Sequence, residues 1–241
     1  MTIMEIKIIF DKAALNKKIH TGWGFSVLVD NKILFDTGEK GEWLIENLGY
    51  MNVAPGAIEG IVISHDHWDH TGGLCTLLRN VEKGMPVYIC PHFSADIKKK
   101  IRDCGGKPVE TGRFQEIAEN IHVTGEILGD YKGSPMPEQA LVLHTEKGIS
   151  VITGCAHPGI LRMLDLIKNA FPKNRFYLVA GGFHLLDEDR RILAFILQEF
   201  KNIEVEMVAP SHCSGPKAEA FFAKEYGAGF VALKAGQTLN M

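Results

Sequence analysis

One short run of residues limits what this chain can be more than any other feature. It is His65-Asp66-His67-Trp68-Asp69-His70, which has the pattern H-x-H-x-D-H. With 10 histidines in 241 residues, composition alone would produce this pattern in roughly 1 in 1,000 such chains. Imidazole nitrogens and a carboxylate are ligands that a borderline divalent ion such as zinc prefers. Since alternate side chains of an extended segment point the same way, His65 and His67 can share one ion while Asp69 and His70 turn toward a second. The alternative interpretation is a polar cluster at the end of a strand.

Other histidines follow apolar runs in a similar way. The runs Val151–Thr153, Leu178–Ala180 and Met207–Ala209 are followed within a few residues by His157, His184 and His212 respectively, with glycines nearby in the first two. Ligand clefts of layered α/β proteins form at strand ends, so we expect one edge of the fold to gather these side chains. We predict His157 and His212 as metal ligands and His184 as a substrate contact or proton donor. Taken singly, each could instead be a hydrogen-bonded structural histidine.

The remaining candidates carry less weight. Four histidines lack the strand and glycine context and are assigned structural or surface roles: His20, His92, His122 and His144. Cys155 is either a soft metal ligand or an inert buried thiol, and Cys213 is taken as inert.

The order of the expected elements predicts an α/β fold. Hairpins are expected over 25–35 and 139–153, and later strands alternate with helices, as in 159–170, 176–180, 188–200 and 205–209. The segments with the weakest helix or strand pattern are Gly105-Gly106 and 129–137. Neither has the composition of a linker between independent domains. We therefore predict one domain, residues 1–241, with two sheets covered by helices.

Composition excludes several function classes. The 26 basic and 29 acidic residues give a net charge of −3, which argues against a nucleic-acid partner and leaves a small molecule as the expected one. No apolar run is long enough to span a bilayer. The five cysteines form no C-x-x-C pair, so free thiols in a reducing compartment, the cytoplasm, are expected. A symmetric homodimer is the commonest assembly if the chain associates.

The sequence resembles the metallo-β-lactamase superfamily. The H-x-H-x-D-H run and Asp36-Thr37-Gly38 after a strand carry the resemblance, together with Gly22-Trp23-Gly24, Gly154-Cys155-Ala156-His157-Pro158-Gly159, Gly181-Gly182-Phe183-His184-Leu185 and His212-Cys213-Ser214-Gly215. The chain is most similar to a subgroup of metal-dependent hydrolase-like proteins that includes an archaeal enzyme of methanopterin biosynthesis. The resemblance implies a four-layer αββα sandwich of the metallo-β-lactamase type, with its metals at one edge.

The resemblance also implies a ligand set. Two zinc ions are expected, with manganese or iron as alternatives: one held by His65, His67 and His157, the other by Asp69, His70 and His212. Asp69 would orient the attacking hydroxide and Asp36 would accept a hydrogen bond from a ligand histidine. The bridging aspartate of the family would fall near Cys155, so Cys155 or His157 would replace it. The position of the family's third histidine falls near Glu126, where no histidine stands.

Three functions follow as hypotheses. The first is a metal-dependent hydrolase that uses a metal-bound water on a small anionic ester or phosphoester, with His184 donating a proton to the leaving group. The second is a metal-dependent transferase of pterin metabolism that joins a pterin to a ribofuranosyl-aminobenzene phosphate. The third is a non-catalytic metal-binding protein.

Overall fold

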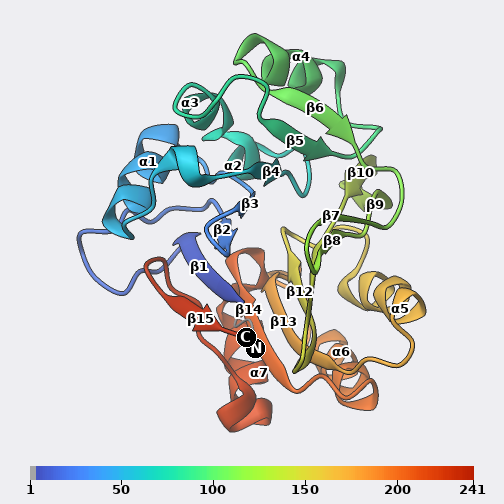
Figure 1. Ribbon diagram of the computed structural model, residues 1–241. Coiled ribbons are helices and arrows are strands. Elements are labelled where there is room, and N and C mark those ends of the chain that lie inside the picture. Colours follow the sequence, from blue (N-terminus) through green and yellow to red (C-terminus); the bar gives the residue numbers. More distant parts are fainter. Residues whose placement is uncertain (1–3) are drawn as a thin grey trace. The chain divides into compact units, whose positions relative to one another are not determined.

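The computed structural model describes residues 4–241 and divides into two compact units (Figure 1). Unit 1 comprises the chain up to Gly112 together with Leu233–Met241, and unit 2 comprises Arg113–Ala232. Two such units can belong to one domain or to two, so the single domain over 1–241 stays a prediction.

Unit 1 is built on a mixed sheet. Among the described residues its strand order is β15-β1-β2-β3-β4-β5-β6. The bounds are β1 (Glu5–Phe10), β2 (Ser26–Val29), β3 (Ile33–Phe35), β4 (Gly60–Val62), β5 (Pro86–Ile89), β6 (Lys107–Glu110) and β15 (Thr238–Asn240). β15, β1, β2 and β3 pair antiparallel, whereas β3 to β6 pair parallel. The expected hairpin turns at Asp30-Asn31, both in the left-handed region that suits a tight hairpin turn.

Three helices of unit 1 cover one face of this sheet. α1 (Gly41–Tyr50), α3 (Leu74–Leu78) and α4 (Ala95–Asp103) bury leucines and isoleucines in one core with side chains of β2 to β5. α4 begins at Ser94, whose hydroxyl accepts the N–H of Ile97. Two short helical turns complete the unit, η1 (Pro55–Ala57) and α2 (Trp68–Thr71).

A disulfide joins Cys75 in α3 to Cys104 at the end of α4. The expectation that all five cysteines are free thiols is therefore wrong. The two residues are 29 positions apart in the sequence, and only the packing of α3 beside α4 brings them together, so no local spacing indicated the pair. Cys90, Cys155 and Cys213 are buried and not disulfide-bonded. The cytoplasmic location loses the support of the cysteines and stays a prediction.

Unit 2 contains a second mixed sheet and a separate hairpin. Within the described chain the sheet order is β14-β13-β12-β11-β8-β7. The bounds are β7 (Gln115–Ala118), β8 (Ile121–Val123), β11 (Leu141–Thr145), β12 (Gly148–Thr153), β13 (Phe176–Gly182) and β14 (Met207–Ser211). β12, β13 and β14 run parallel, so their carboxyl ends meet at one edge of this sheet. The hairpin consists of β9 (Ile127–Tyr131) and β10 (Ser134–Glu138), in the segment that the sequence had presented as loose.

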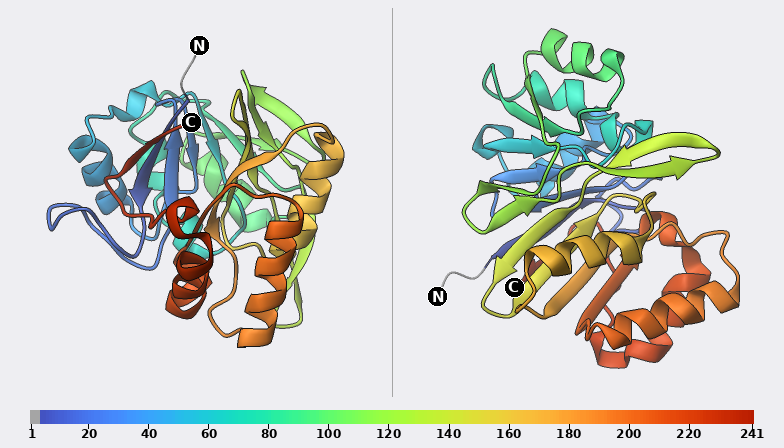
Figure 2. Two further views of the ribbon diagram at one scale, coloured as in Figure 1. Left: turned by 90° about the horizontal axis from the view of Figure 1, so that it is seen from below. Right: turned by 90° about the vertical axis from the view of Figure 1, so that its right-hand side faces the viewer.

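Helices α5 (Ile160–Ala170), α6 (Arg190–Asn202) and α7 (Gly215–Tyr226) pack on the six-stranded sheet. Figure 2 shows α5 and α6 side by side along it. Their apolar residues share one core with β12, β13 and β14, centred on Phe183, Phe200 and Phe222. Short 3-10 turns follow β14 and α7, η2 (His212–Ser214) and η3 (Gly227–Gly229).

Two large sheets with their helices confirm the predicted α/β fold class. The helices expected near 159–170 and 188–200 form within two residues of those bounds. None of the helices in residues 4–241 is long and apolar enough to cross a bilayer.

Candidate metal-binding site

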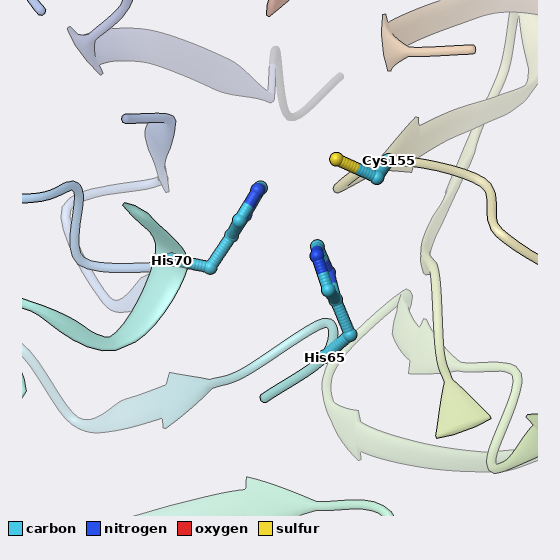
Figure 3. A group of neighbouring side chains, drawn as sticks. All are labelled: His65, His70 and Cys155. Carbon is cyan, nitrogen blue, oxygen red and sulfur yellow. The ribbon is translucent and has the colours of Figure 1, made fainter. Parts of the chain in front are cut away.

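The H-x-H-x-D-H run leaves β4 and enters α2 in unit 1. His65 lies three residues beyond the end of β4, and His67 precedes the first residue of α2, which carries Asp69 and His70. The Nε2 atom of His65 lies 3.0 Å from Nδ1 of His67, and the His65 and His70 rings are 4.1 Å apart (Figure 3). Asp69 Oδ2 lies 3.4 Å from His70 Nε2. All four predicted ligands of this run therefore lie together.

Asp36, at the end of β3, orients two of these imidazoles. Its Oδ2 accepts a hydrogen bond from Nδ1 of His70 at 2.6 Å and another from the Ser64 hydroxyl at 2.7 Å. Because the only proton of that hydroxyl goes to Asp36, we assign Nδ1 of His65, 2.9 Å from Ser64 Oγ, as a donor to it. Each imidazole then holds a proton on Nδ1, and Nε2 is the nitrogen that a metal ion would bind, in place of the second proton that His70 carries when charged.

The carboxylates around His70 also set its charge. Burial disfavours the imidazolium, but Asp36 and Asp69 outweigh burial and raise the pKa of His70 to about 10. Asp36 itself is fully buried and has a φ of 57°, a conformation that an aspartate keeps only where its surroundings fix it.

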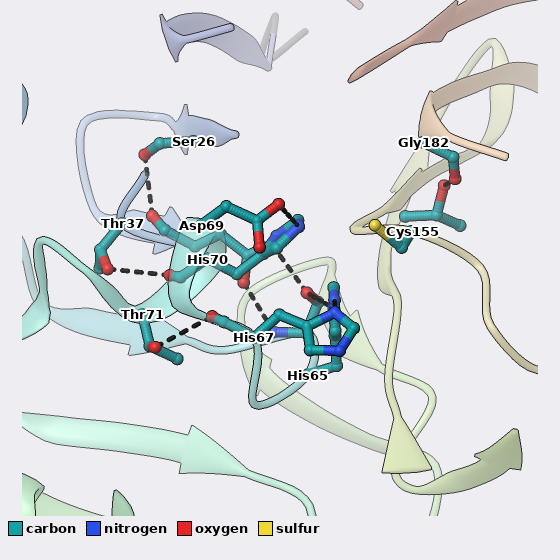
Figure 4. Close-up of polar contacts among 12 residues, drawn as sticks. Ser26, Thr37, His65, His67, Asp69, His70, Thr71, Cys155 and Gly182 are labelled. Atoms are coloured by element: carbon teal, nitrogen blue, oxygen red, sulfur yellow. Dashed lines mark hydrogen bonds and ion pairs between the residues drawn. The ribbon is translucent and has the colours of Figure 1, made fainter. Parts of the chain in front are cut away.

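Close backbone contacts hold the run in place. The N–H and the hydroxyl of Thr37 both donate to the carbonyl of His70, at 2.8 and 2.9 Å (Figure 4). A Cβ atom on Gly72 or Gly73 would lie 2.2 Å from the carbonyl oxygen of Glu39 or of Thr37. Glycine is therefore required at both positions, and the Asp36-Thr37-Gly38 and H-x-H-x-D-H segments form one structure.

In unit 2, three parallel strands deliver the other candidates. β12 leads to Cys155 and His157, β13 to His184, and β14 to His212 and Cys213. The possible ligand atoms of Cys155, His157 and His184 lie within 4.8 Å of one another, as do those of Cys155, His212 and Cys213. The structure thus brings the strand-end residues of this unit together.

Backbone strain accumulates at the same strand ends. Ala156, His184 and His212 have φ values of 62°, 55° and 49°, in the left-handed region that costs a residue with a Cβ atom energy. Such strain persists only where the surrounding structure fixes it, and it is concentrated at functional sites.

Glu138, the last residue of β10, fixes the turn that carries Cys155 and His157. Its Oε1 accepts the backbone N–H groups of Cys155 and Ala156 at 2.9 and 2.8 Å, and its Oε2 accepts that of His157 at 2.7 Å. The side chain is fully buried. Sequence reasoning missed Glu138 because a lone glutamate next to the segment 129–137 gave no signal.

Cys213, whose assignment as an inert thiol stays a prediction, lies among polar partners. Burial disfavours its thiolate, but hydrogen bonds with Cys155 and His184 and the nearby His212 outweigh burial and hold the pKa of Cys213 well below its usual value. The hydrogen bond that the His184 imidazole donates to the Cys213 sulfur raises the pKa of His184. Each of the two groups therefore favours the charged form of the other.

The four histidines outside the strand context lie elsewhere. His20 stacks on Trp43 and pairs with Glu46. His122 and His144 pack against Phe171 in unit 2. His92 follows β5, and none of these four belongs to a candidate ligand group among the described residues.

The donor chemistry suits a divalent metal. Imidazole, thiol and carboxylate are the groups that bind zinc and its neighbours in the transition series, and in each unit such groups lie close together. In unit 1 the hydrogen bonds of Asp36 and Ser64 also orient the imidazoles as ligands. A mixed α/β fold with clustered candidate metal ligands defines the class of this protein.

The family is more specific. Residues 24–212 match the model of the metallo-β-lactamase superfamily, which confirms the resemblance, and the chain belongs to that superfamily. Members are mostly metal-dependent enzymes.

Two relatives come from Methanocaldococcus jannaschii. One is a 7,8-dihydropterin-6-methyl-4-(β-D-ribofuranosyl)-aminobenzene-5′-phosphate synthase, 28% identical over 95% of this chain and 94% of its own. The other is an uncharacterised protein, 30% identical over 88% of this chain and 91% of its own.

Solved structures agree with the fold. A metal-dependent hydrolase of the β-lactamase superfamily superposes with a TM-score of 0.83 and 29% identity, covering 99% of each chain. The Zn²⁺-bound PqqB of Methylobacterium extorquens gives a TM-score of 0.67 at 14% identity over 98% of this chain and 100% of its own, which is a likeness of fold alone.

Proposed function

We propose that this protein is a divalent-metal-dependent hydrolase acting on a small anionic ester or phosphoester. The observation that carries the proposal is the hydrogen-bond network of Asp36, which holds His70 directly and His65 through Ser64 with Nε2 as the ligand atom. When bound, a divalent ion supplies a Lewis acid that polarises the scissile bond and lowers the pKa of a water. A protein without a metal would gain nothing from so many buried, oriented imidazoles.

The proposed ligand sets are those that the sequence suggested. His65, His67 and His157 would hold one ion, and Asp69, His70 and His212 the other, with zinc as the first choice and manganese or iron as alternatives. Cys155 would contribute as a ligand or beside the ligands. Each set combines residues of unit 1 with a histidine of unit 2. The support for these sets is therefore the sequence pattern and family membership.

Two residues have proposed roles in the reaction. The Asp69 carboxylate, 4% exposed, would orient the attacking water and accept its proton. The exposed His184 imidazole, with its raised pKa, would donate a proton to the leaving-group oxygen as its bond breaks.

A second candidate function is favoured by one relative. The synthase from M. jannaschii matches nearly the whole length of this chain, which supports a transferase of pterin metabolism. In that reaction an aromatic nucleophile would form a bond to the pterin methylene carbon, while the bond from that carbon to a leaving oxygen breaks and its electron pair departs with the oxygen. The nucleophile would then release its own proton to water.

Metal content decides first between these enzymes and a non-catalytic protein. We would measure metal per chain by mass spectrometry on protein purified without added metal or chelator, and repeat it on His67→Ala. About two ions that fall in the variant support the dinuclear proposal, and one ion would restrict it to a single centre. No metal after reconstitution would overturn it.

Product analysis separates the two reactions. The metal-loaded protein would be incubated with phosphate esters, thioesters and an activated pterin, with water as the only acceptor or with an aromatic amine phosphate added. Products formed in water alone identify a hydrolase. Products that appear only with the added acceptor identify a transferase, and a metal-loaded protein that is inactive in both assays would contradict both reactions.

A further inference from the structure

The β9–β10 hairpin presents one face to the rest of unit 2. Tyr131 pairs with Ser134 and Ile127 with Glu138 across the two strands. Side chains alternate along a strand, so Tyr131, Ile127 and Glu138 share a face. Ile127 and Glu138 are buried, whereas Leu128, on the opposite face, is 53% exposed. The face that carries Tyr131 is therefore turned inward.

Three contacts fix this face on the turn that follows β12. Glu138 accepts the N–H groups of the Cys155–His157 turn, as described above. A Cβ atom on Gly129 would lie 2.6 Å from the backbone nitrogen of Pro158, so the two backbones touch. Arg162 in α5 donates to the carbonyl of Leu128 at 2.7 Å. These contacts hold both β9 and β10. The turn that positions His157 therefore also positions Tyr131.

The Tyr131 ring lies near a cation and two imidazoles. Its centroid is 5.2 Å from that of His157, at an interplanar angle of 73°, and 6.2 Å from that of His184, at 75°. The ammonium of Lys132 lies 5.0 Å from the Tyr131 centroid. Tyr131 is half-buried, while His184 and Lys132 are exposed, so this group of rings reaches solvent.

We propose that Tyr131, with His184 and Lys132, forms a subsite for a planar aromatic group of the substrate. Aromatic rings bind each other by offset stacking or edge-to-face contact, and Tyr131 with His184 offers rings for either. The Lys132 ammonium supplies a charge for an anionic substituent of the same molecule. The inference rests on the proposed function, because it places this group beside His157, a proposed metal ligand.

A binding titration tests the subsite without turnover. The probe is a fluorescent pterin, added to the wild-type protein as purified and to the variants Tyr131→Leu and Tyr131→Phe. We expect about tenfold weaker binding for Tyr131→Leu, and affinity within about twofold of the wild type for Tyr131→Phe, which keeps the ring. Thermal unfolding of each variant checks that it is folded.

Tyr177→Leu is the matched control. The Tyr177 ring also has a lysine ammonium at 5.0 Å, that of Lys147, but it lies at the start of β13, seven residues before His184. This variant should bind the pterin as the wild type does. Equal losses in Tyr177→Leu and Tyr131→Leu would overturn the subsite, as would wild-type affinity in Tyr131→Leu or no pterin binding to the wild type.

Metal content, measured on the same samples, keeps the two proposals apart. Loss of pterin binding in Tyr131→Leu with unchanged metal supports the subsite. Loss of metal in the same variant would overturn it in favour of a purely structural role for Tyr131. A wild type that binds pterin through Tyr131 yet holds no metal would retain the subsite and reject the metal-dependent function.

Discussion

The carboxylate of Glu138 accepts the backbone N–H of His157 at 2.7 Å, 19 residues away in the sequence. The N–H groups of Cys155 and Ala156 donate to the same carboxylate. Three backbone donors therefore surround one buried side chain. Consecutive N–H groups that converge on an anion form a stable turn. The hairpin that was expected to be loose therefore determines where two proposed ligands lie.

Glu138→Gln tests this role. The amide retains an oxygen for Cys155 and Ala156 but turns its NH₂ group toward the N–H of His157, so this turn should loosen. We expect zinc affinity to fall by about 10- to 100-fold, measured by competition with a chromogenic chelator. Glu119→Gln, an exposed glutamate of the same unit, should leave the affinity unchanged, and an equal loss there would contradict a specific role for Glu138.

Asp36 should control the pH dependence of stability in the metal-free protein. The pKa of His70 rises from 6.5 to about 10 in the folded state. The folded chain therefore binds the extra proton more tightly, and this stabilisation is complete below pH 6.5 and lost as the pH rises to about 10. Urea unfolding across that range should show the decline in the wild type and a smaller decline in Asp36→Asn. Identical slopes would refute the assignment.

Asp69→Ala should leave the fold intact and remove turnover. The Asp69 carboxylate lies among the candidate metal ligands, with Oδ2 3.4 Å from His70 Nε2. We expect kcat to fall by about 10² or more on whichever substrate is identified. Asp66→Ala is the control, because Asp66 accepts a hydrogen bond from Ser94 at 2.6 Å instead. An Asp69→Ala protein with most of its activity would exclude the proposed role.

His122 should make unit 2 less stable in mild acid. Burial, with a smaller effect of His144, lowers the pKa of His122 below 6.5 although Glu116 opposes this. The unfolded chain then binds more protons than the folded chain, so the free energy of unfolding should fall as the pH drops below 6.5. His122→Phe, which keeps a ring between Phe114 and Phe171, should lose this slope. Denaturant melts at several pH values will show whether it does.

The Cys75–Cys104 disulfide should stabilise unit 1. It closes a loop between residues 29 positions apart, for which the loss of unfolded-state entropy amounts to about 3 to 4 kcal/mol. Cys104→Ser should therefore lower the free energy of unfolding by about 3 to 4 kcal/mol. Wild-type protein in reductant should match the variant, and a reductant effect that persists in Cys104→Ser would assign the change to another cause.

The sequence predicted the strand ends well. Apolar runs followed by histidine correctly placed β4, β12, β13 and β14, because a buried strand and the polar group at its end leave a local signature. The run from His65 to His70 was clear for the same reason.

Long-range features were harder. Pro135 and Pro137 with Gly129 and Gly133 had the signature of a loop, yet a two-stranded ribbon has free edges on which proline is tolerated. Glu138 and Tyr131 gained their roles only through that hairpin. Helix α7 begins with Gly215-Pro216, a proline at a helix start that could have been recognised.

The network of Asp36 has a practical consequence for interpreting genomes. This carboxylate holds His70 and, through Ser64, His65, so a chain can keep every histidine and still lose the orientation of two of them. A gene copy that has a small apolar residue at this position should therefore be suspected of having lost its metal while keeping its fold. Inspection of this one residue, about thirty positions upstream of the histidine run, would separate copies that keep the carboxylate from copies that have lost it before any protein is made.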